Sequence, residues 1–176
     1  MKKSEGKAKT PEATGSAELT DQFVIIRDKP LMLLLRNIGA AVEEGKEAKI
    51  PLIEAAYFAE KRKLPFTKDE ILALASKTDP LAKEKYIVID YLRSRGYITR
   101  VSLDTTEYLR LHRKGFRPGE DRTYYLVKVV DGSWVPKTGE LDAALDFAGK
   151  LRKELVVAVV DGSRPRFMKF GRANFE

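Results

Sequence analysis

The chain contains no cysteine and only one histidine, His112, among its 176 residues. Disulfide bonds and thiolate metal sites are therefore excluded, and a histidine-rich zinc site would have too few ligands. The apolar runs at 31–35, which ends at Arg36, and at 155–160 are far too short to span a bilayer. The charged N-terminus lacks the apolar core of a signal peptide, so we expect a cytoplasmic protein that does not contact a membrane.

Standard catalytic motifs are also missing. The sequence has no glycine-rich phosphate loop, no GxSxG element and no cluster of metal ligands at a suitable spacing. What it does have is an excess of positive charge, with 33 Lys and Arg against 26 Asp and Glu and a net charge of +7. Such an excess attracts phosphate backbones through counterion release. Charge alone is equally compatible with a basic protein that binds no nucleic acid.

The N-terminal half is predicted to be a small α+β unit. Residues 1–20 offer almost nothing to bury and are expected to form a disordered basic tail, followed by an N-terminal domain over 21–85. Apolar stretches at 23–26 and 31–35 are short enough to be strands, and a turn-like segment separates them.

Three helices are expected next, each with a recognisable start. Pro51 opens the first. Thr67 and Glu70 form a capping box at the start of the second. Asp79, followed by proline, caps the third, which is expected to end at Gly96.

The C-terminal half, 86–176, changes to strand periodicity. Alternating aromatic and β-branched residues predict strands; a helix-spaced stretch predicts one crossover helix at 139–153. The expected strands lie at 97–101, 108–112, 124–130, 155–160 and 166–170. The run at 155–160 is continuously apolar, which is typical of a strand covered on both faces. The predicted fold class is α+β, with a mixed sheet in this second domain.

Several segments together resemble the archaeal tRNA-intron splicing endonuclease family. They are PLIEAAYFAEKRKLPF, YLRSRGYITR, YYLVKVV and KLRKELVVAVVDG. The resemblance extends from about residue 23 to residue 170. It implies a restriction-nuclease-like, tRNA-endonuclease-like fold for the C-terminal domain, and a metal-independent enzyme that uses no cofactor.

The family's catalytic triad of tyrosine, histidine and lysine carries over only in part. The tyrosine position falls on His112, the histidine position on Arg122 and the lysine position on Lys153, so only the lysine is retained. The spacings of 10 and 31 residues agree with the family arrangement. The departure therefore concerns residue type rather than alignment.

The altered residues bear directly on the family reaction. As the resemblance implies it, a ribose 2′-OH attacks the adjacent phosphate, which requires a base, an acid and a cation for the developing charge. Lys153 can supply the cation. The His112 imidazole can in principle act as the base, because imidazole titrates at about pH 6.5. The Arg122 guanidinium retains its proton up to a pKa of about 12 and cannot act as the acid. The site is predicted to be degenerate.

The predicted function is therefore that of a non-catalytic structural subunit of a tRNA-intron endonuclease. By resemblance, two such chains would assemble with two catalytic subunits of the same family and recognise precursor tRNA at a bulge–helix–bulge. Two alternatives remain open. The chain could still cleave RNA with His112 and Lys153, or it could be a stand-alone RNA-binding module.

Two surface contacts are also predicted. Basic residues around the loop after 108–112 would neutralise RNA phosphates; they are Arg110, Arg113, Lys114, Arg117 and Arg122. In the family, an acidic loop after the VVD strand docks into a basic pocket on a neighbouring subunit. Here that loop offers a single acid, Asp161, which we expect to be the docking residue.

Overall fold

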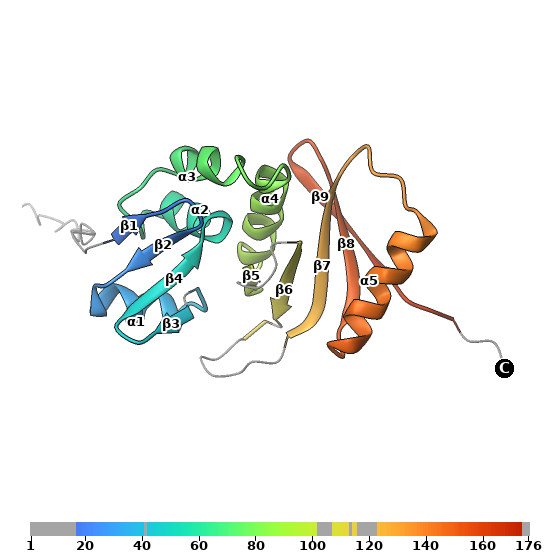
Figure 1. Cartoon of the computed structure of the whole chain (residues 1–176), viewed down its shortest axis with the longest axis horizontal. Helices are drawn as coiled ribbons and strands as arrows, with labels where there is room; N and C mark the ends of the chain where they lie inside the picture. Colours follow the sequence, from blue (N-terminus) through green and yellow to red (C-terminus); the bar gives the residue numbers. More distant parts are fainter. Residues whose placement is uncertain (1–16, 41, 102–106, 113, 116–122, 174–176) are drawn as a thin grey trace, which may run out of the picture.

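The computed structural model describes residues 17–40, 42–101, 107–112, 114–115 and 123–173. It contains one antiparallel sheet and one mixed sheet, with helices packed between and beside them (Figure 1). The helices are α1 (Lys29–Asn37), α2 (Leu52–Glu60), α3 (Lys68–Ala75), α4 (Ala82–Arg93) and α5 (Thr138–Lys150). None of the helices in these described ranges is long and apolar enough to cross a membrane.

The first sheet is antiparallel, with the strand order β1-β2-β4-β3. Its strands are β1 (Ala17–Leu19), β2 (Phe23–Ile26), β3 (Val42–Glu44) and β4 (Glu47–Pro51). The β2 strand confirms the prediction at 23–26. The β3–β4 hairpin was not predicted, although Gly45, which adopts a φ of 67°, is the kind of residue its turn requires.

The strand predicted at 31–35 is wrong, because this run lies in helix α1. Asp28 caps the helix: its side chain accepts a hydrogen bond from the Leu31 backbone N–H at 2.9 Å. The buried residues are Leu31, Met32 and Leu35, a helical spacing, whereas Leu33 remains 57% exposed. An apolar run of five residues cannot distinguish a strand from one face of a short helix.

The predicted tail extends too far at its C-terminal end. Residues 17–19 form β1, in which Ala17 pairs with Ile26 and Leu19 with Val24. An ion pair between Glu18 and Arg27, 2.8 Å apart, also holds the strand. None of its three side chains is fully buried, which explains why its composition resembles that of a tail. Residues 1–16 lie outside the described part of the chain.

Two of the three helix-start predictions are confirmed. The Thr67 hydroxyl accepts from the Glu70 backbone N–H at 3.2 Å, and α2 begins directly after Pro51. The third prediction is wrong about the capping residue: Asp79 accepts from the Leu81 backbone N–H at 2.9 Å, but α4 begins at Ala82 and its N-cap is Leu81, which makes no side-chain capping bond. Past its last helical residue, α4 ends in a turn closed by Gly96, whose φ is 82°.

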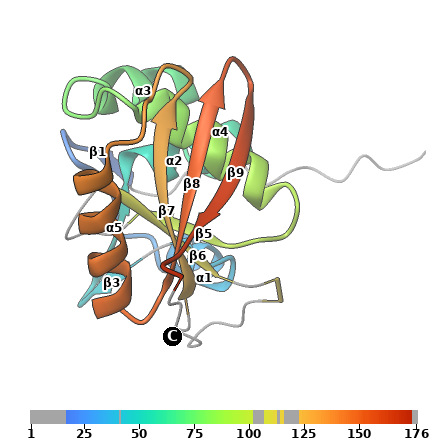
Figure 2. The ribbon, with the colours of Figure 1, turned by 90° about the vertical axis from the view of Figure 1, so that its right-hand side faces the viewer.

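The second sheet is mixed, with the strand order β5-β6-β7-β8-β9. Its strands are β5 (Thr99–Val101), β6 (Tyr108–His112), β7 (Thr123–Asp131), β8 (Glu154–Asp161) and β9 (Arg164–Phe170). Among these described strands only β7 and β8 pair in parallel, and α5 forms the crossover between them. In Figures 1 and 2 this sheet lies between α4 and α5. The predicted α+β class and mixed sheet are confirmed.

One hydrophobic core runs through both halves of the molecule. It is continuous from Val24 and Ile50 of the first sheet, through Ile89 of α4, to Val127 and Ala158 of the second sheet. The boundary predicted between residues 85 and 86 falls inside α4, which packs against α2 on one side and the second sheet on the other. The division into two domains at that point stays a prediction.

Candidate functional site

Three strand ends meet at the lower edge of the second sheet in Figure 1. His112 is the last residue of β6, Thr123 is the first residue of β7, and Lys153 immediately precedes β8. His112 pairs with Thr123 after a bulge between Leu111 and His112. The structure therefore brings together two of the three positions that the sequence assigns to the family triad, His112 and Lys153, on either side of Thr123.

The end of α5 determines where Lys153 lies. Arg152 adopts a left-handed conformation with φ of 54°, and its backbone N–H donates to the Gly149 carbonyl at 2.9 Å. The Lys153 N–H donates to the Ala148 carbonyl at 2.9 Å, which completes a Schellman motif. The Lys153 ammonium then donates to the Thr123 carbonyl oxygen at 3.0 Å and to the Thr123 hydroxyl. The lysine is thus directed onto the start of β7.

His112 is almost completely buried, with 2% of the residue exposed. Its backbone N–H donates to the Ile98 carbonyl oxygen at 2.8 Å, which joins the end of β6 to the residue before β5. A general base for RNA cleavage must reach the ribose 2′-OH within hydrogen-bond distance. The buried imidazole is poorly placed for that task.

Only two of the predicted RNA-contact residues lie in the described ranges. Arg110 is half-buried in β6, where it pairs with Arg100 of β5. Lys114 is exposed, and its ammonium lies 5.0 Å from the centroid of the Tyr97 ring. The remaining ones, Arg113, Arg117 and the triad position Arg122, lie outside the described residues.

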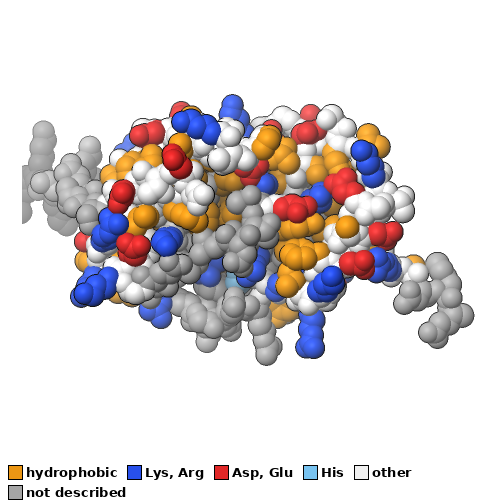
Figure 3. Space-filling model, viewed as in Figure 1, with side chains coloured by type: hydrophobic (Ala, Val, Ile, Leu, Met, Phe, Trp, Pro, Cys, Tyr) orange, Lys and Arg blue, Asp and Glu red, His pale blue; other side chains and the backbone are white. Residues whose placement is uncertain are grey.

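Positive charge gathers at the same edge of the molecule. In Figure 3, which has the orientation of Figure 1, blue Lys and Arg side chains predominate along the lower edge of the face in view. That is the edge at which β6 ends and β7 begins. An edge of this kind suits a polyanionic ligand.

A buried ion pair, which the sequence analysis did not predict, lies close to this edge. The Arg93 guanidinium donates to a Glu54 carboxylate oxygen at 2.8 Å, and Glu54 and Arg93 are 1% and 8% exposed. Burial raises the pKa of Glu54 to about 7, and this effect outweighs the opposing effect of the Arg93 and Arg100 charges. The available signals were an acid inside the apolar helix LIEAAYFAE and an arginine inside YLRSRGY.

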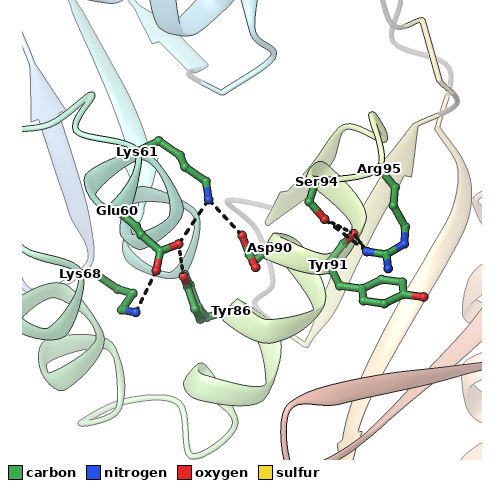
Figure 4. Close-up of polar contacts among 8 residues, drawn as sticks. All are labelled: Glu60, Lys61, Lys68, Tyr86, Asp90, Tyr91, Ser94 and Arg95. Carbon is green, nitrogen blue, oxygen red and sulfur yellow. Dashed lines mark hydrogen bonds and ion pairs between the residues drawn. The ribbon is translucent and has the colours of Figure 1, made fainter. Parts of the chain in front are cut away.

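A second polar network covers the outer surface of α2, α3 and α4 (Figure 4). Glu60 accepts from the Tyr86 hydroxyl at 2.6 Å and from the Lys68 ammonium at 2.9 Å. Burial, followed by the Glu60 hydrogen bond, raises the pKa of Tyr86. Farther along α4, the Arg95 guanidinium stacks 3.5 Å from the Tyr91 ring centroid. The Glu60 contacts tie the three helices together rather than forming a reactive centre.

The predicted docking residue, Asp161, ends β8 at the turn into β9. Its side chain is 74% exposed, and its carboxylate lies 3.9 Å from the Arg166 guanidinium. Gly162, with φ of 65°, shapes the turn. One exposed acid beside a basic residue makes this turn only weakly anionic.

A pocket of about 290 Å³ lies where the two halves of the chain meet. Ile38, Tyr57, Lys61 and Lys63 line it from the N-terminal half, whereas Arg93 and Tyr97 line it from the other side. No acidic side chain is among the described residues that line it. In the described ranges, no group of three or more His, Cys, Asp or Glu residues could hold a metal ion.

Comparison with known proteins agrees with this geometry. Residues 82–165 match the family model of the tRNA intron endonuclease, catalytic C-terminal domain. A tRNA-splicing endonuclease from Pyrococcus furiosus is 34% identical over 150 residues, covering 80% of this chain and 85% of that protein. Those from Thermococcus kodakarensis and Methanothermobacter thermautotrophicus are 32% and 30% identical, covering 72% and 82% of this chain and 76% and 88% of those proteins. This chain belongs to the tRNA-intron endonuclease family.

Proposed function

We propose that this chain is a non-catalytic structural subunit of a tRNA-intron endonuclease. The observation that carries the proposal is the arginine at position 122, where the family reaction needs a group that releases a proton. General acid–base catalysis contributes about 10²–10⁴-fold, and a guanidinium cannot release a proton near neutral pH. A chain without that acid retains very little cleavage activity of its own.

The described residues at the site support the same proposal. The His112 imidazole is buried, so it is poorly placed to take a proton from a ribose hydroxyl. The Lys153 ammonium is held by the carbonyl and hydroxyl oxygens of Thr123. The retained lysine therefore has a role within the fold, and its retention does not by itself imply cleavage.

The proposed substrate of the assembled enzyme is precursor tRNA with a bulge–helix–bulge. The relatives named above are tRNA-splicing endonucleases, and this chain covers more than three quarters of the length of each. Arg110 and Lys114 flank His112 at the basic edge of the sheet. Together with Arg113, Arg117 and Arg122, they would contact phosphates and contribute affinity without reading bases.

The proposed partners are two catalytic subunits of the same family, assembled with two copies of this chain. The edge strand β9 exposes Phe167 and Met168, which are 36% and 43% exposed and suit a protein interface. The pocket between the two halves carries Lys61, Lys63 and Arg93 and suits an acidic loop from a partner. Asp161 is the proposed reciprocal contact from this chain.

Cleavage assays with the chain alone and in a mixture test the proposal. The purified chain is incubated in EDTA with a bulge–helix–bulge RNA, with and without a family member that has tyrosine, histidine and lysine at the triad positions. We expect no cleavage by the chain alone. In the mixture we expect cleavage of the RNA. We also expect a stable hetero-oligomer, which size-exclusion chromatography with light scattering detects.

Two other outcomes would overturn the proposal, each in favour of one alternative. Cleavage by the isolated chain that is abolished by His112→Ala would establish a catalytic subunit that uses His112 and Lys153. RNA binding by a chain that stays monomeric in every mixture would establish a stand-alone RNA-binding module.

A further inference from the structure

The Glu54–Arg93 ion pair lies against the outer edge of β5. Among the strands in the described ranges, β5 is the first of the five-stranded sheet and pairs with β6 alone. The Ile98 carbonyl accepts from the His112 N–H, so the polar backbone groups of residues 98 and 100 face β6. The groups of Thr99 and Val101 consequently point away from β6, toward the edge where a further strand would pair.

The ion pair satisfies these outward groups. The Arg93 guanidinium donates to the Thr99 carbonyl oxygen at 2.8 Å, and Glu54 accepts from the Val101 backbone N–H at 3.3 Å. Arg93 and Glu54 are joined to each other at 2.8 Å. The pair thus offers one donor and one acceptor at the spacing that a neighbouring strand would offer. Thr99 and Val101 are buried, so water does not perform this role.

The same pair ties β5 to the N-terminal half of the chain. Glu54 belongs to α2, and Arg93, at the end of α4, also donates to the carbonyls of Ile38 and Gly39 at 3.3 and 3.4 Å. Arg100 of β5 adds a bond to the Gly39 carbonyl at 2.8 Å. The position of β5 is therefore set by contacts that the N-terminal half supplies.

We propose that Glu54 and Arg93 cap the β5 edge of the second sheet and thereby position the end of β6 that carries His112. β5 pairs with β6 in the register Thr99–Leu111 and Val101–Leu109, so a shift of β5 moves the strand that ends at the triad position. Glu54 and Arg93 are positioning residues: neither is among the residues assigned to RNA contact. This gives the first arginine of YLRSRGY a physical role.

A buried ion pair is an unusual choice for a core, because its desolvation often costs as much as its Coulomb energy returns. Apolar side chains at these two positions would pack well but would leave the Thr99 carbonyl and the Val101 N–H without partners. Edge capping accounts for the presence of two charges at this place.

Hydrogen–deuterium exchange of the full-length chain at about pH 8, where Glu54 is a carboxylate that accepts both bonds, tests the cap. Glu54→Gln preserves size, but it places an amide NH2 against one of the two donors that the carboxylate now satisfies. We expect amide exchange in β5 and β6 to rise about tenfold or more, because buried hydrogen bonds of the cap are lost. Exchange in β8 should stay at its wild-type rate. Glu60→Gln is the matched control on the outer side of the same helix (Figure 4), and it should leave β5 and β6 unchanged.

Two results would overturn the inference. An equal rise in β5, β6 and β8 would mean that the pair adds only global stability, and no rise in any strand would mean that it caps nothing. If Glu54→Gln does not fold, the double variant Glu54→Leu with Arg93→Met removes both charges together and should show the same local rise. The experiment needs neither RNA nor partner, so its failure is distinct from a failure of the proposed function.

Discussion

The ammonium of Lys153 donates a hydrogen bond to the carbonyl oxygen of Thr123 at 3.0 Å, although the two residues are 30 positions apart. The bond joins the corner between α5 and β8 to the first residue of β7, and the Thr123 hydroxyl accepts from the same ammonium. The lysine is half-buried and Thr123 is buried, so the contact is partly shielded from water. A lysine held in this way stabilises the fold whether or not RNA is present.

The first prediction concerns this contact. Lys153→Met should lower the free energy of unfolding by about 2 kcal/mol, and Thr123→Val by about 1 kcal/mol, because each removes part of a charge-assisted hydrogen bond. The double variant should cost clearly less than the two single changes added together. Urea unfolding of the four proteins measures the coupling. Lys150→Met, on the exposed side of α5, should change stability by at most about 0.5 kcal/mol. Strict additivity would contradict the coupling.

The second prediction concerns the pH dependence of stability. Burial raises the pKa of Glu54 from 4.5 to about 7, so the folded chain holds this proton more tightly than the unfolded chain. The contribution of Glu54 to stability is therefore fully present below pH 4.5 and is lost as the pH rises through about 7. Relative to Glu54→Gln, the wild-type chain should gain stability between pH 7.5 and pH 5, by at most about 3 kcal/mol.

A second carboxylate provides a control of opposite sign for that experiment. Hydrogen bonds from Tyr86 and Lys68 lower the pKa of Glu60, so its contribution to stability is lost as the pH falls. Relative to Glu60→Gln, the wild-type chain should therefore lose stability toward acid pH. Chemical unfolding at several pH values from about 3 to about 8 compares the three proteins, because this range spans the ordinary carboxylate pKa and the raised pKa of Glu54. The same direction of change in both pairs would contradict the assigned pKa shifts.

The sequence predicted the elements whose local signals agree with their burial. Thr67 and Glu70 cap α3 as a short-range motif requires, and the apolar run at 155–160 lies in a central strand as its composition indicates. The run at 31–35 misled because its five apolar residues suit either state. The hydrogen bond from the Leu31 N–H to Asp28 caps this segment as a helix. Asp28 was not recognised as a cap because the residues around it also resemble a turn.

The candidate site was predictable in its positions but not in its contacts. Resemblance placed His112 and Lys153 at one site, and the strand ends do bring them together. The roles of Thr123 and Glu54 were not predictable, because both depend on partners far away in the sequence. Glu54, for example, needs Arg93, 39 positions away, before its charge can be buried. Such pairings are determined by tertiary packing, for which a single sequence carries no periodic signal.

The third prediction restores the missing chemistry. The double variant His112→Tyr with Arg122→His supplies the residue types of the family triad, with Lys153 already in place. The chain is assembled with a triad-bearing family member whose own catalytic histidine has been replaced, and cleavage of a bulge–helix–bulge RNA is followed in EDTA. We expect a gain within the range of about 10²–10⁴-fold that general acid–base catalysis contributes. His112→Tyr alone should show no gain. No gain in the double variant would mean that position, as well as residue type, has departed from the family site.

The fourth prediction concerns assembly through the turn between β8 and β9. Asp161 is 74% exposed and has one long ion pair, to Arg166, so its removal should hardly change the stability of the isolated chain. If Asp161 docks into a basic pocket of the partner, Asp161→Ala should raise the dissociation constant of the hetero-oligomer about tenfold, which corresponds to about 1.4 kcal/mol.

Asp146→Ala is the matched control and should leave assembly unchanged. It removes an exposed carboxylate of α5 that pairs with Arg172. Analytical ultracentrifugation at low and high salt measures both variants, and the effect of Asp161 should shrink at high salt because exposed charges are screened. An unchanged dissociation constant at low salt would remove this turn from the interface and leave the β9 edge as the surface on which assembly depends.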